Sequence, residues 1–267
     1  MMFFNKKKKY DLVYSLGAYC GTALYMTKHQ LRLTSGPFDW LPYIPFEKRI
    51  DYIINDFIDF LNFEDLNYID KKIYKNVDKK HSYYKNKRNG FVYFHDFPEN
   101  EPLEKSFRQV KERYNRRIER FYKYIYQSEK ILFIWFSQED VNTLDRTLID
   151  SYKKIKEKFD KDIDFLIIEQ DKNLSKNFIK KCIINKNIVR YYVNSIIYEN
   201  KNKTILGNDK LINKIFSKYS INITFFDLIR KICIYPITIF YPIKSIRKKL
   251  RYKYIYPHFK GDFYETK

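Results

Sequence analysis

The sequence is poor in the residues that interrupt or cross-link a chain: among 267 residues there are 6 glycines, 8 prolines and 3 cysteines. So little glycine and proline argues against long flexible linkers. The cysteines, Cys20, Cys182 and Cys233, are odd in number and far apart, which argues against a disulfide framework and a cysteine-rich zinc site. Because the basic start is also followed by no apolar signal-peptide region, we expect a reducing, cytoplasmic location.

Several other patterns are missing. No stretch holds eighteen or more uncharged apolar residues, so no membrane-spanning helix is expected. The stretch L-G-A-Y-C-G lacks the lysine and serine of a P-loop and the third glycine of a dinucleotide fingerprint. No pair of histidines or cysteines has metal-ligand spacing. We therefore expect neither a metal nor a cofactor.

Acidic residues are also scarce, with 32 Asp and Glu against 52 Lys and Arg, for a net charge of +20. This balance points to an anionic partner such as nucleic acid, acidic lipid or a phosphate-bearing substrate. An equally good explanation is a coding bias, since Lys, Asn, Ile and Tyr are enriched together throughout. Of these partners, nucleic acid is the one we do not expect.

Apolar patterning predicts strands alternating with helices. Strands are expected at 12–15, 91–94, 131–136, 164–169 and 188–193, and helices after residue 20 and at 46–65, 103–130, 141–159 and 177–183. Residues 67–89 are polar and are expected to be irregular, with room for one short strand. The alternation predicts an α/β domain at 1–200, with a layered, mostly parallel sheet and flanking helices.

A basic-aromatic extension at 201–267 is expected to follow this domain. Residues 221–256 mix large apolar residues with many Lys and Arg, and Pro236 and Pro242 divide them into two short helices. Such a segment fits peripheral binding to an anionic inner-membrane surface. A tail packed on the core is the equal alternative.

Cys20 is the first candidate for chemistry. It lies in a turn between a strand and a helix, flanked by Gly17 and Gly21, where the helix dipole and unpaired amides favour a thiolate. The glycines permit a tight turn that leaves amides available to an oxyanion, and Ser15 precedes them. The alternative is a small buried cysteine of structural role.

His95 and Asp96 follow an expected strand, which suits a general base at the end of a sheet. A structural histidine bonded to backbone is the alternative. The loop S-G-P-F-D-W, from Ser35 to Trp40, places Asp39 between two aromatic residues. Asp39 could orient His95 or bind a substrate hydroxyl, or it could only stabilise the turn.

Three arginines, Arg116, Arg117 and Arg120, fall within about one turn of the long expected helix at 103–130. They could converge on a phosphate or carboxylate. A solvated helix face explains them equally well.

The ordered motifs S-L-G-A-Y-C, S-G-P-F-D-W, G-F-V-Y-F-H-D-F, Y-N-R-R-I-E-R-F and I-L-F-I-W-F carry a family resemblance over about residues 10–170. Together they resemble a bacterial family described as papain-like cysteine peptidases, whose members look like neighbours of capsule and lipopolysaccharide biosynthesis genes. The resemblance implies a Cys–His arrangement at Cys20 and His95, with Asp96 or Asp39 as third member. The alternation after residue 103 departs from a papain-like barrel, so the resemblance supports the site more than proteolysis.

Two functions from different classes follow. The first is a cysteine-dependent hydrolase or acyl transferase in surface polysaccharide assembly, acting on a glycan or glycolipid. The second is a glycosyl or phosphoryl transferase on a lipid-linked glycan, in which the three arginines hold donor phosphates. A scaffold on membrane or nucleic acid is the non-enzymatic alternative.

Overall fold

The computed structural model describes residues 7–73, 80–199, 202–204 and 206–222, together with the isolated positions 229, 232, 233 and 242. The chain falls into two compact units, Met1–Ser220 and Ile221–Lys267. The helices expected in 221–256 lie almost entirely outside the described residues. Of the extension expected at 201–267, residues 202–204 and 206–222 are described.

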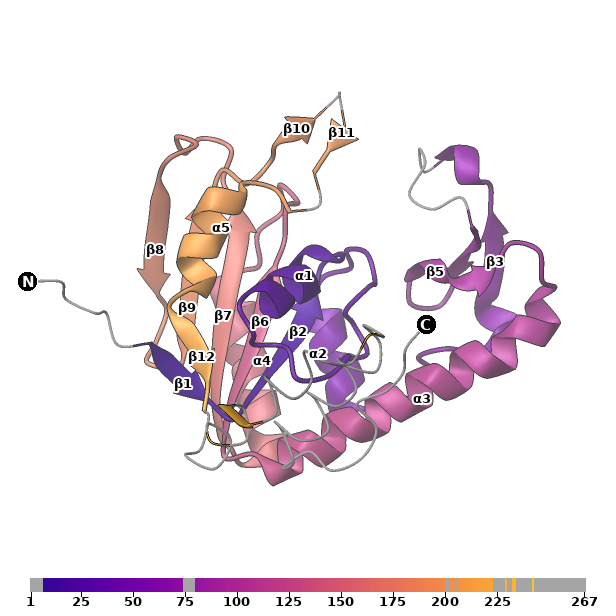
Figure 1. Cartoon of the computed structure of the whole chain (residues 1–267), viewed down its shortest axis with the longest axis horizontal. Coiled ribbons are helices and arrows are strands. Elements are labelled where there is room, and N and C mark those ends of the chain that lie inside the picture. Colours follow the sequence, from indigo (N-terminus) through magenta and orange to yellow (C-terminus); the bar gives the residue numbers. More distant parts are fainter. Residues whose placement is uncertain are drawn as a thin grey trace, which may run out of the picture. The chain divides into compact units, whose positions relative to one another are not determined.

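A five-stranded sheet forms the centre of this unit, in the order β2-β6-β7-β9-β8 (Figure 1). Neighbours β2, β6, β7 and β9 run parallel, and β8 joins the edge antiparallel to β9. Its strands are β2 (Leu12–Gly17), β6 (Lys130–Phe136), β7 (Asp162–Gln170), β8 (Ile179–Ile183) and β9 (Ile188–Val193). The central strands are near-continuous apolar runs because helices cover both faces of a parallel sheet.

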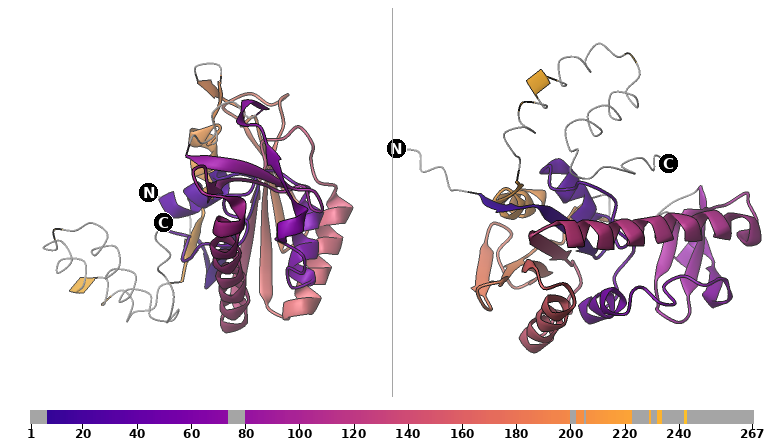
Figure 2. Two further views of the ribbon diagram at one scale, coloured as in Figure 1. Left: turned by 90° about the vertical axis from the view of Figure 1, so that its right-hand side faces the viewer. Right: turned by 90° about the horizontal axis from the view of Figure 1, so that it is seen from below.

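Helices form a layer on each face of the sheet. Helix α1 (Gly21–Lys28) packs with α5 (Asp209–Phe216), and α2 (Phe46–Ile54) packs with α4 (Asp145–Phe159). Figure 2 shows these two pairs on opposite faces. The expected mixed α/β fold, with a mostly parallel central sheet and flanking helices, is confirmed.

A second, three-stranded antiparallel sheet was not expected. It comprises β3 (Leu66–Ile69), β4 (His81–Asn86) and β5 (Val92–Pro98), in that order. Helix α3 (Leu103–Gln127) packs against β5 with its first half. The smaller elements are β1 (Lys8–Tyr10), β10 (Tyr198–Glu199), β11 (Asn202–Lys203), β12 (Tyr219–Ile221), η1 (Phe63–Asp65) and η2 (Lys71–Ile73).

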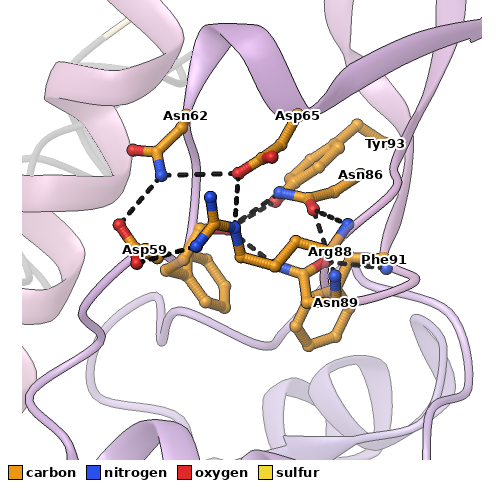
Figure 3. A network of polar contacts seen from close by, with 9 residues as sticks. Asp59, Asn62, Asp65, Asn86, Arg88, Asn89, Phe91 and Tyr93 are labelled. Atoms are coloured by element: carbon orange, nitrogen blue, oxygen red, sulfur yellow. Dashed lines mark hydrogen bonds and ion pairs between the residues drawn. The ribbon is translucent and has the colours of Figure 1, made fainter.

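A polar network holds the β4–β5 turn against the segment before β3 (Figure 3). Arg88 donates to Asp65 Oδ2 at 2.9 Å and to Asp59 Oδ2 at 3.1 Å. The Asn86 Oδ1 accepts the amides of Arg88 and Asn89, while the Asn89 side chain donates to Phe60 O. The turn at Asn89-Gly90 is thus fixed by short polar side chains that bond nearby backbone.

Four expected elements were wrong in type or extent. Residues 179–183 form strand β8 rather than a helix, because a hairpin closed at 184–187 lets them pair with β9. The helix expected at 46–65 ends at Ile54, and the one expected at 141–159 begins only at Asp145. The polar residues 67–89 hold two strands instead of at most one.

Candidate functional site

Cys20 lies where β2 ends and α1 begins, at the carboxyl edge of the parallel sheet. It is the N-cap residue of α1, is partly exposed and forms no disulfide. The turn before it is held in place because the Thr22 hydroxyl donates to Gly17 O at 3.0 Å. Gly17 has φ +92°, which an L side chain rarely adopts. The predicted strand, turn and helix around Cys20 are confirmed.

Most amides of this turn already have partners in the protein. The Gly17 amide donates to Ser15 Oγ at 3.0 Å, and the amides of Ala18 and Tyr19 donate to Phe136 O and Leu41 O. Ser15 is itself buried. Donors for an anion therefore have to come from the first turn of α1, beginning at Gly21, where amides have no intrahelical acceptor.

Asp39 is held by Arg32 rather than left open to solvent. Its Oδ2 accepts from Nε and Nη2 of Arg32 and from the Gly36 amide at 3.0 Å. Arg32 also donates to Ser35 Oγ and lies 5.4 Å from the Trp40 ring centre. The aspartate is buried, so it serves as the anchor of residues 35–40.

Arg49 is a buried cation at the same edge of the sheet. It projects from the core-facing side of α2 and is 0% exposed. Its guanidinium lies 5.2–5.6 Å from the ring centres of Phe38, Phe91 and Trp135. Nη2 donates to the carbonyls of Leu41 and Pro42, whereas Nε and Nη1 have no acceptor among the described residues.

No carboxylate within the described residues forms an ion pair with Arg49. Burying such a charge uncompensated costs several kcal/mol. Its cation–π contacts, at about 2 kcal/mol each, and its carbonyl bonds offset much of that cost without neutralising the charge. Burial accordingly lowers the pKa of Arg49, while the phenols of Tyr19 and Tyr43 act in the opposite direction. The fold therefore keeps a cation that packing alone would not require.

Glu169 is the penultimate residue of β7, two strands from β2 along the same edge. It is 0% exposed, and its Oε1 accepts the Thr143 amide at 2.9 Å. Its Oε2 lies 3.3 Å from Nε of Arg190, which also binds Asp145 at 2.7 Å. Burial raises the pKa of Glu169, and the bonds to Thr143 and the charge of Arg190 oppose that rise. This pair, in contrast to Arg49, is internally compensated.

His95 and Asp96 lie inside β5, in the three-stranded sheet, and not at the end of the strand as expected. Pairing with β4 continues to Pro98, so the strand does not stop at His95. The His95 ring is partly exposed and stands edge-on to His81, with ring centres 6.3 Å apart. Asp96 accepts from Arg113 Nη2 at 2.8 Å and from the Tyr114 hydroxyl at 3.1 Å.

The three arginines of α3 differ in their surroundings. Arg116 is exposed, Arg117 lies over the Tyr114 ring at 5.1 Å, and Arg120 is buried. The predicted residues thus fall into groups on different elements. One group surrounds the turn between β2 and α1: Ser15, Gly17, Cys20 and Gly21. A second group shares the loop at 35–40: Ser35, Asp39 and Trp40. The third, His95 and Asp96, belongs to the three-stranded sheet. Catalytic pairing of Cys20 with His95 stays a prediction.

The described part of the chain holds neither a metal-binding cluster nor a membrane-spanning helix. No group of three His, Cys, Asp or Glu side chains there could hold a metal ion. Within the same residues, no helix is both long and apolar enough to cross a membrane.

Comparison with known proteins identifies the family. Residues 11–172 match the model of the family described as "Putative papain-like cysteine peptidase (DUF1796)". The chain belongs to this family. An uncharacterized protein of Acanthamoeba polyphaga mimivirus is 29% identical over 185 residues, which cover 65% of this chain and 78% of the viral protein. No solved structure matches the chain significantly.

The family match begins at the strand before Cys20 and ends just after β7. It therefore includes the turn of Cys20, the loop of Asp39, and both Arg49 and Glu169. Sequence reasoning missed Arg49 and Glu169. For Arg49 a signal existed: it shares the apolar face of α2 with Phe46, Ile50 and Ile53, at spacings of three and four.

Proposed function

We propose that the protein is a cysteine-dependent hydrolase or acyl transferase with Cys20 as its nucleophile. One observation carries the proposal: Cys20 caps the N-terminus of α1 directly after a parallel strand, at the sheet edge where α/β proteins bind ligands. Family membership supports a hydrolase. The helix end favours the thiolate, which is the nucleophilic form.

The proposed reaction is acyl transfer through a thioester. The Cys20 thiolate attacks a substrate carbonyl, and the oxyanion is stabilised by first-turn amides of α1. Collapse expels the leaving group, which takes a proton from a general acid, and water or an acceptor hydroxyl then attacks the thioester. His95 is the proposed acid and base, and Asp96 the proposed third member. In this role Asp96 would act through the Arg113 and Tyr114 bonds that fix β5.

The three cysteines supply an internal test of the nucleophile. At pH 7, limited iodoacetamide treatment followed by mass spectrometry should alkylate Cys20 about tenfold faster than Cys182, which is also partly exposed. Cys20→Ala should abolish hydrolysis of an ester, thioester and peptide panel, a loss of about 10³-fold or more. Cys182→Ala is the matched control and should retain activity. Activity that survives in Cys20→Ala contradicts the proposal.

His81 is a natural control for His95, because the two rings lie side by side on neighbouring strands. His95→Gln should lower kcat by roughly 10²–10⁴-fold, whereas His81→Gln should leave it near wild type. Equal losses in both variants would assign the effect to the sheet rather than to a base at His95.

The substrate that the bacterial resemblance suggests is a capsule or lipopolysaccharide glycan or glycolipid, and this stays a prediction. Complementation of a capsule-deficient strain with wild type and Cys20→Ala would test it. The transferase alternative depends on three converging arginines, and the burial of Arg120 beside the exposed Arg116 gives it less support.

A further inference from the structure

Arg49 is a buried cation without an anion in the part of the chain that the structure describes. Its Nη2 bonds two backbone carbonyls, but Nε and Nη1 are shielded from solvent and lack acceptors. Two other arginines have carboxylate partners: Arg190, also buried, has Glu169 and Asp145, and Arg32 has Asp39. Arg49 thus keeps hydrogen-bonding capacity that no described residue uses.

This unused capacity lies beside Gly17, in the turn that leads to the candidate nucleophile. The guanidinium packs so closely on Gly17 that a Cβ there would overlap it. Gly17 O in turn accepts the hydroxyl of Thr22, in the first turn of the helix that Cys20 caps. Leu41 O accepts both Arg49 Nη2 and the Tyr19 amide. Arg49 and Cys20 therefore belong to one hydrogen-bonded unit at the carboxyl edge of β2.

Two tyrosines add polar hydroxyl groups to the otherwise aromatic surroundings of Arg49. Tyr19 and Tyr43 are partly exposed, and their hydroxyls are near enough to act electrostatically on Arg49. The Tyr43 ring lies 6.0 Å from that of Trp135, whose face the guanidinium covers. These partly exposed rings are the route by which we expect an anion to reach Nε and Nη1. A phenol and a guanidinium together are donors suited to carboxylate or phosphate oxygens.

A structural role alone does not explain the residue. Three aromatic faces favour the cation but do not neutralise it, and an aliphatic side chain of similar volume would fill the same space. We propose that Arg49 is the receptor for an acidic group of the substrate, a carboxylate or a phosphate, whose reacting carbonyl lies at Cys20. The proposal rests on the function proposed for Cys20, and it names the substrate class: an acylated molecule with an anionic group near the scissile bond.

Trp135 offers a direct reporter, since the chain has two tryptophans and the other is Trp40. In a Trp40→Phe background, inorganic phosphate and N-acetylglycine are titrated at constant ionic strength, with N-acetylglycinamide as the neutral probe. Emission from Trp135 should change saturably with one of the anions, and Tm should rise by a few degrees. The amide should do neither. The anion that binds more tightly distinguishes a phosphate from a carboxylate substrate.

Variants then assign the binding to Arg49. Arg49→Met should weaken it at least tenfold, and Arg49→Lys, which keeps the charge but not the planar donors, about threefold or more. Arg108→Met is the matched control, because this α3 side chain is 87% exposed, and it should bind like wild type. If Arg49→Met does not fold, Arg49→Lys decides. Absence of saturable binding by either anion, or undiminished binding in both Arg49 variants, overturns the proposal.

The result is separable from the fate of Cys20. Anion binding should persist in Cys20→Ala, because the receptor contains no sulfur. Fast alkylation of Cys20 should persist in Arg49→Met without added anion. Loss of hydrolysis with retained anion binding would thus count against the nucleophile alone, and the reverse pattern would count against the anion receptor alone.

Discussion

The two sheets differ in one buried charge: those beside the three-stranded sheet have partners of opposite charge, whereas Arg49 beside the parallel sheet has none among the described residues. Beside the three-stranded sheet, Asp96 is bound by Arg113 and Tyr114, and Asp65 by Arg88. At the carboxyl edge of the parallel sheet, Arg49 has backbone carbonyls and aromatic faces but no carboxylate among the described residues. A satisfied pair is what a fold needs for stability, whereas an unpaired buried charge costs stability. The difference marks the carboxyl edge as the region shaped by function.

The largest expected effect comes from alkaline pH, and it involves both regions. Tyr14 under the parallel sheet, and Tyr93 and Tyr114 beside the smaller one, are fully buried, which raises the pKa of each well above 10. The folded state thus holds protons that the unfolded state releases, so stability is complete below pH 10 and falls above it. Each tyrosine contributes about 1.4 kcal/mol per pH unit.

Together the three should lower the free energy of unfolding by about 3 kcal/mol between pH 10 and 11, because the unfolded phenols are already half ionised at pH 10. The lowered pKa of Arg49 acts in the opposite direction. Urea titrations at pH 8, 10 and 11 measure the slope. Constant stability up to pH 11 would contradict the burial of these phenols.

A pair of glycines compares the two regions directly. Gly17 and Gly90 both have positive φ, +92° and +81°, but a Cβ at Gly17 would overlap Arg49, whereas one at Gly90 would meet open space. Gly90→Ala should cost about 1 kcal/mol for the backbone alone, and Gly17→Ala about 2–4 kcal/mol with the steric conflict added. Chemical denaturation of both variants measures the difference. Gly17→Ala combined with Arg49→Ala should recover part of the loss; equal costs at the two glycines would refute the close packing of Arg49.

The smallest expected effect on stability comes from comparing the paired charge of Asp96 with the charge of Arg49, which has no acidic partner among the described residues. Asp96→Asn weakens the bond to Arg113, which is 31% exposed, and should cost about 1–2 kcal/mol. Arg49→Met removes a charge that has no counter-ion, so stability should stay within about 1 kcal/mol of wild type or increase. Thermal and urea unfolding check both. A larger loss in Arg49→Met than in Asp96→Asn would show that Arg49 supports the fold.

Much of the architecture could be predicted because it depends on local periodicity. The buried strands β6, β7 and β9 and the long amphipathic α3 stand out in the sequence, and the strand-turn-helix around Cys20 follows from two glycines and an apolar run. The errors arose where strand pairing, rather than local sequence, determines the secondary structure. Strand β8 has two isoleucines four residues apart, which fits a helix equally well until β9 is present to bond it.

The candidate site was only partly predictable for the same reason. Cys20 is recognisable because its position depends on its neighbours in sequence. Arg49 cannot be recognised in this way, because its distinguishing feature is the lack of an acidic partner. Only the folded chain shows that the nearby acids Asp39 and Glu169 are bound to other arginines. The periodicity of α2 places Arg49 on the buried face but cannot say that no acid meets it there.

The close contact between Gly17 and the Arg49 guanidinium has an evolutionary consequence. Because the Arg49 guanidinium occupies the space where a Cβ at position 17 would lie, the two positions cannot vary independently. Relatives that keep arginine at 49 should keep glycine at 17, and relatives that acquire a larger residue at 17 should carry a shorter one at 49. This covariation between a turn and a helix 32 positions apart can be read from sequences alone, and a family in which the two positions drift separately would have lost the contact.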